Sequence, residues 1–229
     1  MPTDLPDVTL AVVDSVACSL SFLAIRDTLQ EITPAEVLIF SDKREEFREF
    51  GDWVVETPQI KSLAEAGEVI WYEIAALTRT SHVLLIQWDG WVLDGERWDK
   101  NWLAYDYIGA PWPWHTEHSV GNGGFSLRST RLMKHLAINR RQYPHVVPED
   151  DTICRAYRPE LEEDGFCFAP QREALGFAFE RTPPCPAFGF HGLQNLMKVL
   201  PPTLLDERIE LANDYVRGKV EWRQMVDHA

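Results

Sequence analysis

Short apolar runs alternate with helical patterns through the first 90 residues of the chain. Runs rich in β-branched residues predict strands at residues 8–13, 37–40, 53–55 and 83–87. Between them, apolar side chains recur at helical spacing and predict helices at residues 20–32 and 62–77. Strands that alternate with helices are typical of a parallel sheet covered by helices on both faces. The pattern therefore predicts an α/β fold.

The rest of the chain carries a weaker pattern. Helices are predicted at residues 129–139, from Pro148 toward Tyr157, and at 204–226, with a late strand at 166–169. The sequence contains no internal repeat, no low-complexity segment and no clear linker. We therefore expect a single domain over residues 1–203, with residues 204–229 forming a C-terminal helical tail packed on the same domain.

Composition and charge argue against some classes of binding partner and cellular location. The 229 residues carry a formal net charge of -14 at pH 7, which argues against nucleic acid, because its binding needs clustered Lys and Arg. No stretch approaches the roughly 20 apolar residues of an integral membrane segment, and the first residues lack the basic region and apolar core of a secretion signal. The four cysteines form no Cys-x-x-Cys pair, as expected for reduced thiols. A cytoplasmic protein is predicted.

Asp89 is the first candidate for chemistry, because it follows the buried strand at residues 83–87 and precedes a glycine. Ligands of open α/β sheets bind outside the carboxyl ends of the strands. The chain has neither Gly-x-Gly-x-x-Gly nor the Walker pattern, so the phosphates of a nucleotide would need another partner. A manganese or magnesium ion held by Asp89 would serve, since such ions combine one or two protein oxygens with phosphates. The alternative is an Asp-Gly pair that only forms a turn.

A glycine-rich loop is the second candidate. Gly121, Asn122, Gly123 and Gly124 precede the predicted strand that begins near Phe125. The glycines allow a close approach of the backbone to a ligand, and backbone N–H groups there would bind a substrate hydroxyl or phosphate. Asn122 is a candidate to hydrogen-bond a sugar hydroxyl. The alternative is a tight loop with no ligand.

An acidic segment follows Pro148. Glu149, Asp150 and Asp151 stand at a predicted helix start, where proline and acids are favourable for capping alone. The functional interpretation is that Asp150 or Asp151 acts as general base on an attacking hydroxyl. Glu149 would then face the helix end or an acceptor hydroxyl.

Aromatic residues supply the remaining candidates. His191 stands between aromatic residues and glycine in Phe-Gly-Phe-His-Gly, where it would be a metal ligand through a ring nitrogen; a structural or exposed histidine is the alternative. Six of the nine tryptophans fall within residues 88–114. Most are expected in the core, whereas Trp112 or Trp114, in a proline-rich segment, would line a cleft and stack on a sugar.

These segments follow one another in an order that resembles a known pattern. Gln-Trp-Asp occurs at residues 87–89, Tyr-Asp-Tyr-Ile-Gly-Ala-Pro-Trp at 105–112, Val-Gly-Asn-Gly-Gly-Phe-Ser-Leu-Arg at 120–128, Pro-Glu-Asp at 148–150 and Phe-Gly-Phe-His at 188–191. Over about residues 8–195 the chain resembles a bacterial domain family related to glycosyltransferases of the GT-A fold. The resemblance implies a Rossmann-type mixed sheet flanked by helices in a single domain.

The resemblance also implies roles for single residues. Asp89 matches the last acid of the Asp-x-Asp metal motif, Gln87 replaces its first acid as a contact to ribose or sugar, and His191 matches a C-terminal metal ligand. Glu149 and Asp150 match the pair that supplies the base in inverting relatives, which favours Asp150 and leaves Asp151 beside it as a second possibility. The substrate site would contain Gln87, Trp88, Trp112, Gly121, Asn122, Gly123 and Gly124.

The activity implied is transfer of a sugar from a nucleotide-diphosphate-sugar donor to a hydroxyl of a glycan or lipid-linked glycan, with inversion and a divalent metal. By analogy we expect polysaccharide biosynthesis in the cytoplasm, with peripheral contact to the inner face of the membrane through the acceptor. Two alternatives stay open. One is a metal-dependent hydrolase of a glycoside or phosphoester, with Asp89 and Asp150 flanking the bond. The other is a non-catalytic carbohydrate-binding protein.

Overall fold

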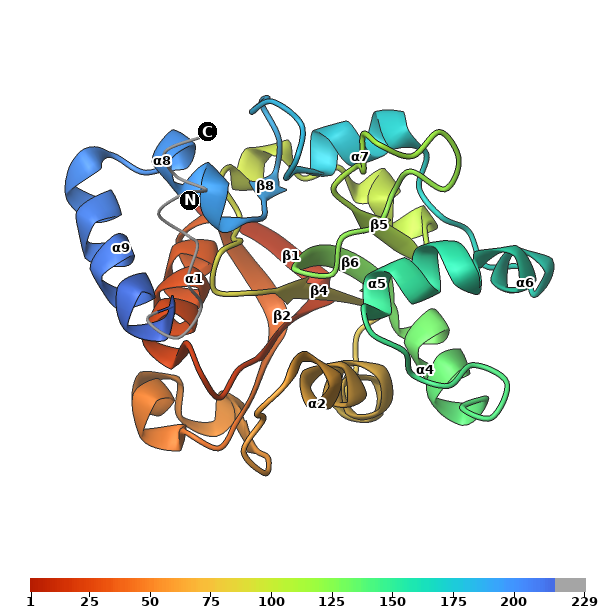
Figure 1. The fold of residues 1–229 in the computed structure, drawn as a ribbon, viewed down its shortest axis with the longest axis horizontal. Helices are drawn as coiled ribbons and strands as arrows, with labels where there is room; N and C mark the ends of the chain where they lie inside the picture. The colour runs from red at the N-terminus through yellow and green to blue at the C-terminus, as the bar shows by residue number, and fades with distance from the viewer. Residues whose placement is uncertain (217–229) are drawn as a thin grey trace.

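A six-stranded sheet with the order β3-β2-β1-β4-β6-β5 forms the centre of the computed structural model, which describes residues 1–216 (Figure 1). Its strands are β1 (Thr3–Val13), β2 (Ile32–Ser41), β3 (Val54–Glu56), β4 (His82–Ile86), β5 (Tyr107–Gly109) and β6 (Phe125–Ser129). The first four strands run parallel, and β6 is antiparallel to both β4 and β5. A second, two-stranded parallel sheet pairs β7 (Ala178–Phe179) with β8 (Gly189–Phe190).

Helices and helical turns connect the strands. The α-helices are α1 (Cys18–Glu31), α2 (Leu63–Glu68), α3 (Ile74–Leu77), α4 (Thr130–Ile138), α5 (Glu149–Asp151), α6 (Arg158–Glu163), α7 (Gln171–Phe177), α8 (Leu196–Val199) and α9 (Pro202–Val216). The 3-10 turns are η1 (Arg44–Trp53), η3 (Gly95–Arg97), η4 (Lys100–Ala104) and η6 (Leu193–Asn195). The π-helical turns η2 (Val69–Glu73) and η5 (Thr152–Ala156) continue α2 and α5.

Strand β4 shows why the sheet is covered on both faces. Successive side chains of a strand point to opposite faces, and all five residues of β4 are buried. Leu84 and Ile86 pack into the core that includes residues of α1, α7 and β8, whereas Val83 and Leu85 pack against the α2–α3 segment and α4. In Figure 1, α7 and β8 accordingly lie above the sheet, and α2 and α4 lie below it. The mixed α/β sheet flanked by helices is confirmed.

The sequence pattern located β1 to β4 and the start of β6, and it gave no prediction for β5, β7 or β8. The predicted strands at 8–13, 37–40, 53–55 and 83–87 coincide with β1 to β4. The predicted strand at 166–169 forms one isolated bridge, between Phe168 and Tyr107, because Pro170 follows and α7 begins at Gln171. The predicted helix at 62–77 forms with a π-helical turn in its middle.

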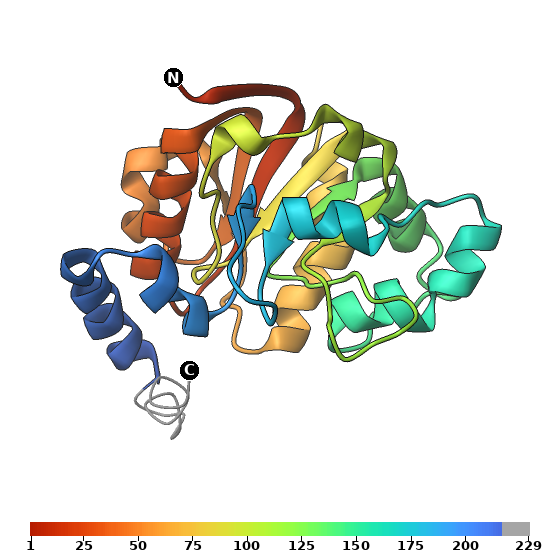
Figure 2. The same ribbon diagram turned by 90° about the horizontal axis from the view of Figure 1, so that it is seen from above.

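Helix α9 lies where β1 and β4 end. Its Arg208 is buried, pairs with Asp27 of α1 and lies over the ring of Trp91, while Ala212 packs with residues that follow β1. Figure 2 shows α9 (dark blue) at the left edge of the view. The predicted helix at 204–226 extends beyond the described residues, and the division at residue 203 stays a prediction. No helix within residues 1–216 is long and apolar enough to span a membrane.

Ser129 joins β6 to α4 and generates a stability prediction. Its hydroxyl accepts a hydrogen bond from the N–H of Leu132 at 3.0 Å and donates one to the buried carboxylate of Asp106 at 2.5 Å. We expect Ser129→Ala to lower the free energy of unfolding by about 1–2 kcal/mol, because a helix cap and a partner of a buried carboxylate are lost together. Urea denaturation measures this change. The exposed Thr203→Ala variant should stay within about 0.5 kcal/mol of the wild type, and an equally small change for Ser129→Ala would contradict the cap.

Candidate functional site

The segment after β4 is held at both ends by backbone hydrogen bonds. The N–H of Gln87 donates to the carbonyl of Gly124 at 2.9 Å, and the N–H of Gly192 donates to the carbonyl of Asp89 at 2.9 Å. A tight turn follows β4, in which the N–H of Gly90 donates to the carbonyl of Gln87. Asp89 is therefore fixed between the glycine-rich loop and the segment after β8.

His191 meets Asp89 at this point. Nε2 of His191 lies 3.2 Å from Oδ1 of Asp89, and only 15% and 13% of the two side chains is exposed. Burial lowers the pKa of His191, but the carboxylates of Asp89 and Glu180 raise it further, to about 10. Burial raises the pKa of Asp89, and the charge of His191 lowers it below the usual value. The structure thus brings together two residues that stand 102 positions apart and that the sequence analysis put in one site.

Glu180, which the sequence analysis did not select, contacts the other ring nitrogen. Its Oε1 lies 3.4 Å from Nδ1 of His191. The side-chain amide nitrogen of the buried Asn195 donates to the backbone carbonyls of both Glu180 and His191, at 2.8 Å each. The strand pair β7–β8 sets Glu180 and His191 side by side, since Phe179 pairs with Phe190 and each of the two residues follows next in the chain. No sequence spacing signals a contact made by two-residue strands.

The residues at Asp89 fit a cation with few protein ligands. Oδ1 of Asp89 is buried, and its 3.2 Å separation from Nε2 of His191 is close to the about 3 Å between adjacent ligands of an octahedral ion with bonds near 2.1 Å. Oε1 of Gln87 lies 3.3 Å from the same nitrogen. Within residues 1–216, no three His, Cys, Asp or Glu side chains are grouped to hold a metal, because Glu180 faces the opposite nitrogen. The remaining ligands would come from phosphate and water.

The glycines of residues 121–124 make room for side chains of the protein itself. A Cβ at Gly124 would lie 1.9 Å from Nε2 of His191, and one at Gly123 would lie 2.5 Å from Oε1 of Glu149. A Cβ at Gly121 would lie 2.0 Å from the ring of Trp112. Three side chains from different elements therefore lie against these glycines, and the close approach of a ligand to the loop stays a prediction.

Two residues that were predicted to contact a sugar are buried and contact other residues of the protein. Asn122 is buried, has a positive φ of 68°, accepts from the N–H of Phe125 and places its amide nitrogen 3.1 Å from Nδ1 of His191. Trp112 is 6% exposed and packs in the core, whereas Trp114 is 57% exposed. Trp112 and Asn122 thus support the loop, and Trp114 is the tryptophan of this pair with an open face.

The three acids after Pro148 have different surroundings. Glu149 accepts from the buried Arg128 at 2.8 Å. Asp150 accepts from the N–H of Gly123 at 2.8 Å, and burial, followed by the charge of Glu149, raises its pKa. Asp151 is half exposed and pairs with Arg155 one helical turn away. Asp150 and His191 therefore contact neighbouring glycines of one loop, and Asp151 is turned to the surface.

The buried guanidinium of Arg128 is stabilised by several further partners. Its Nη2 also lies 3.4 Å from the carbonyl of Gly123, its Nε donates to Ser126 at 3.0 Å, and the guanidinium lies over the ring of Tyr107. A buried charge is strongly unfavourable unless it is paired and hydrogen-bonded. Arg128, which the sequence analysis quoted only within a motif, therefore fixes Glu149 and the loop together.

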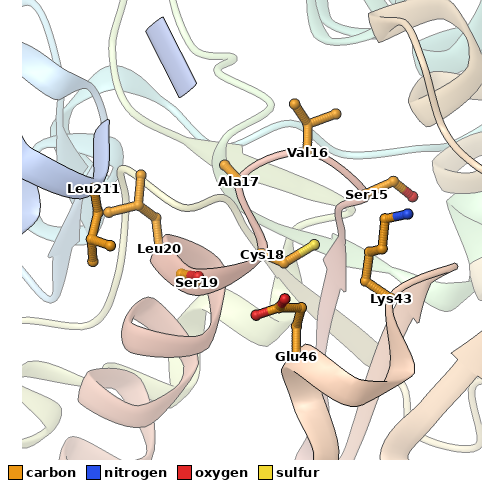
Figure 3. A pocket seen from close by; sticks show the side chains of 9 residues that line it. All are labelled: Ser15, Val16, Ala17, Cys18, Ser19, Leu20, Lys43, Glu46 and Leu211. Atoms are coloured by element: carbon orange, nitrogen blue, oxygen red, sulfur yellow. The ribbon is translucent and has the colours of Figure 1, made fainter. Parts of the chain in front are cut away.

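A cavity of about 380 Å³ opens beside Gln87 and Trp88. It lies between the carboxyl ends of β1 and β4 and the start of α2, and its other lining residues include Asp14, Ser15, Val16, Ala17, Lys61 and Ser62. A second cavity, of about 300 Å³, shares Ser15, Val16 and Ala17 with it and is lined further by Cys18, Lys43 and Leu211 of α9 (Figure 3). The sequence analysis predicted Gln87 and Trp88 for the substrate site but did not select the β1–α1 turn.

Residues 61–191 match the model of a protein family described as "Protein of unknown function (DUF5672)". The matched residues are more than half of the chain. The chain belongs to the DUF5672 family. The DUF5672 match contains Asp89, the glycine-rich loop, Asp150 and Glu180, and it ends at His191. No curated protein sequence matches the chain.

Solved structures of glycosyltransferases share the fold. One, involved in the glycosylation of the major capsid of PBCV-1, is 12% identical with a TM-score of 0.53, over 89% of this chain and 98% of that one. The apo-form glycosyltransferase GlyE of Streptococcus pneumoniae TIGR4 is 11% identical with a TM-score of 0.51, over 97% of this chain and 62% of that one. The mannosyltransferase PcManGT of Pyrobaculum calidifontis, in complex with GDP-Man and Mn²⁺, is 11% identical with a TM-score of 0.51, over 94% of this chain and 64% of that one.

These comparisons establish a GT-A-like fold for this DUF5672 member. The chain spans less than two thirds of the length of GlyE and of PcManGT. At such identities the likeness concerns the fold, and the activity has to be argued from the site.

Gly124 provides a test of the site geometry. We expect Gly124→Ala to lower the free energy of unfolding by about 1–3 kcal/mol, because the new methyl group overpacks against the imidazole of His191. Urea denaturation measures the change. The matched control is Gly176→Ala in α7, where the nearest atom to a Cβ lies 3.9 Å away and where alanine should stabilise the helix by up to about 1 kcal/mol. If the two variants behave alike, His191 does not lie against Gly124.

Proposed function

We propose that the chain is a glycosyltransferase that moves a sugar from a nucleotide-diphosphate-sugar donor to a hydroxyl of a glycan or lipid-linked glycan, with inversion and with a divalent metal. The observation that carries the proposal is the position of the Asp89–His191 pair next to the residues that line the cavity. Gln87 and Trp88 line it, and Asp89 follows them directly. The GT-A-like fold supports the same conclusion, since solved glycosyltransferases share it.

The cavity suits the nucleoside part of a donor. Its volume of about 380 Å³ lies within the range of about 300–1,000 Å³ for small-molecule sites. It is bounded by the carboxyl ends of β1 and β4, where ligands of open α/β sheets bind. Lys61 in its lining would offer a positive charge to a diphosphate, and the carboxylate of Asp14 in the same lining accepts hydrogen bonds from the N–H groups of Val16 and Ala17. We propose that the nucleoside enters this cavity with its diphosphate directed toward Asp89.

The residues that would hold a manganese or magnesium ion are Asp89 and His191, with Gln87 beside them. When bound, such an ion would neutralise the charge that develops on the departing nucleoside diphosphate. Asp89 is suited to this role because its buried Oδ1 lies 3.2 Å from Nε2 of His191. His191 offers Nε2 to the same point. The imidazole has to lose a proton to bind, since a metal ligand is the neutral form.

Asp150 is the proposed general base. The N–H of Gly123 orients its carboxylate at 2.8 Å, and Glu149 is engaged with Arg128, which leaves Asp150 as the acid of the pair that is not neutralised by an arginine. A raised pKa makes a carboxylate a stronger base near neutral pH. Asp150 would take the proton from the acceptor hydroxyl as this attacks the anomeric carbon from the side opposite the leaving diphosphate. That geometry gives inversion.

The setting follows from the proposed acceptor. A lipid-linked glycan at the inner face of the membrane would bring the enzyme to that face as a peripheral protein. The proposed process is polysaccharide biosynthesis in the cytoplasm. The exposed Trp114 is the proposed aromatic contact of the acceptor sugar, because flat aromatic side chains combine large contact area with low loss of conformational freedom.

A thermal-shift screen tests donor binding and the metal together. We expect one diphosphate sugar of uridine, guanosine, cytidine or thymidine to stabilise the protein in the presence of Mn²⁺, by about 5–10 °C at 100 times its dissociation constant. The Asp89→Asn variant should keep its own melting temperature within a few degrees and lose the part of the shift that depends on Mn²⁺. The proposal fails if no such compound stabilises the wild type with or without Mn²⁺.

Asp150→Asn tests the general base. We expect its kcat for transfer to fall by about 100- to 10,000-fold, while donor binding in the thermal-shift assay is retained. Asp151→Asn is the matched control and should change kcat by less than about threefold, because Asp151 pairs with Arg155 at the surface. A base acts only when deprotonated, so kcat should fall as the pH drops through the raised pKa of Asp150, above the usual range of an aspartate. Equal release of free sugar without any acceptor would favour a hydrolase.

A further inference from the structure

The guanidinium of Arg128 joins the acidic segment to the glycine-rich loop. Arg128 is 1% exposed, and its Nη2 lies 2.8 Å from Oε1 of Glu149 and 3.4 Å from the carbonyl of Gly123. The N–H of Gly123 in turn donates to Oδ2 of Asp150 at 2.8 Å. Arg128 therefore holds both neighbours of the Asp150 carboxylate, which are the residue before it in the chain and the glycine that donates to it.

The central sheet anchors this guanidinium. Arg128 lies in β6, where it pairs with Val83 of β4 and with Tyr107 of β5. Its Nε donates to the hydroxyl of Ser126 at 3.0 Å, and its guanidinium carbon lies 4.9 Å from the centre of the Tyr107 ring. The buried hydroxyl of Tyr107 donates to the carbonyl of Asn122 at 3.0 Å. The acids of the short helix α5 are thus positioned by strands, which hold a site more accurately than loops do.

Charge is the second consequence of this arrangement. The ionisable groups around Asp150 are Glu149 and Asp151 of α5, Arg128 of β6, Tyr107 of β5 and Cys154 of η5. Burial raises the pKa of Tyr107 and of Cys154 well above their usual values, so both are neutral near pH 7, and Asp151 pairs with Arg155 at the surface. Two adjacent carboxylates compete for one proton. The pairing of Glu149 with Arg128 decides this competition and leaves Asp150 to take the proton.

We propose that Arg128 is the positioning residue of the transfer reaction, which engages Glu149 and fixes Gly123 so that Asp150 alone takes the proton of the acceptor hydroxyl. The inference rests on the proposed function, because it presumes Asp150 as general base. The electron pair of the broken O–H bond forms the new bond to the anomeric carbon, and the diphosphate leaves with the electrons of the old one. Arg128, Glu149 and Asp150 together carry one net negative charge before this step and none after it.

Arg128→Lys tests the positioning. Lysine keeps the positive charge but replaces the planar fork by one ammonium group, which cannot reproduce the contacts of a guanidinium. We expect kcat to fall by about 10- to 100-fold, while KM for the donor stays within about threefold, since only an interaction made in the transition state is lost. The matched control is Arg158→Lys on α6, where the arginine pairs with Glu162 at 2.7 Å and lies over the ring of Phe168. It should keep the wild-type kcat.

The dependence of kcat on pH provides a measurement that loss of packing alone would not change. Burial raises the pKa of Asp150, the charge of Glu149 raises it further, and the charge of Arg128 lowers it. Glu149→Gln keeps an oxygen for the guanidinium and removes the negative charge, so the acid limb of the profile should move to lower pH. Arg128→Gln should move the limb to higher pH. Glu162→Gln is the control and should keep the wild-type profile.

The proposal is overturned if Arg128→Lys transfers sugar at the wild-type rate, or if Glu149→Gln leaves the pH profile where it was. If Arg128→Lys or Arg128→Gln does not fold, the profile of Glu149→Gln decides alone. If Asp150→Asn is as active as the wild type, the general base is wrong and this inference falls with it, while transferase activity stands.

A wild type that transfers no sugar would refute the proposed function, and an NMR titration then decides what Arg128 does. The ¹³C signal of the Asp150 carboxyl, assigned with Asp150→Asn, reports its ionisation without any substrate. Its titration should move to lower pH in Glu149→Gln and to higher pH in Arg128→Gln. Unchanged titration in both variants would show that the Arg128–Glu149 pair does not govern Asp150.

Discussion

The imidazole of His191 lies against the backbone of Gly124, and the rest of the site depends on this contact. A Cβ at Gly124 would lie 1.9 Å from Nε2, so any larger residue would push the ring away from Asp89. On the neighbouring residue, the N–H of Gly123 holds the carboxylate of Asp150. Two consecutive glycines of the loop thus contact the two groups, Gly124 the Asp89–His191 pair and Gly123 the acidic segment.

The two groups beside this loop differ in charge. On the Asp89 side an imidazole lies between two carboxylates, an arrangement that is balanced either by a proton on the ring or by a cation. On the other side the buried guanidinium of Arg128 is neutralised by Glu149, and Asp150 stays without an arginine. Glu149 and Asp150 are consecutive, yet one stabilises a buried charge and the other is destabilised as an anion by its burial and by its neighbour.

The sequence predicted the parts of this arrangement that have a local signal. Buried strands show as apolar runs, and a polar residue directly after one, such as Asp89, is visible without a structure. His191 stood out through its glycine and aromatic neighbours. Glu180 had no such signal, because the pairing of two-residue strands β7 and β8 brings it to the ring. The roles of Asn122 and Trp112 also depended on packing: the residue types suggested sugar contacts, whereas the fold uses both to support the loop.

Asp14 and Asp89 show why the fold was needed to choose between two similar aspartates. Each follows a buried parallel strand, and the two strands are neighbours in the sheet. The carboxylate of Asp14 accepts hydrogen bonds from the N–H groups of Val16 and Ala17, at 2.7 and 2.9 Å, and from the hydroxyl of Ser21. Its hydrogen bonds are therefore made within the turn into α1. The carboxylate of Asp89 pairs instead with the ring of His191, whose Nε2 lies 3.2 Å from Oδ1. Because a buried charge is costly unless it is paired, this ion pair with a residue from the end of β8 argues against a turn as the sole reason for Asp89.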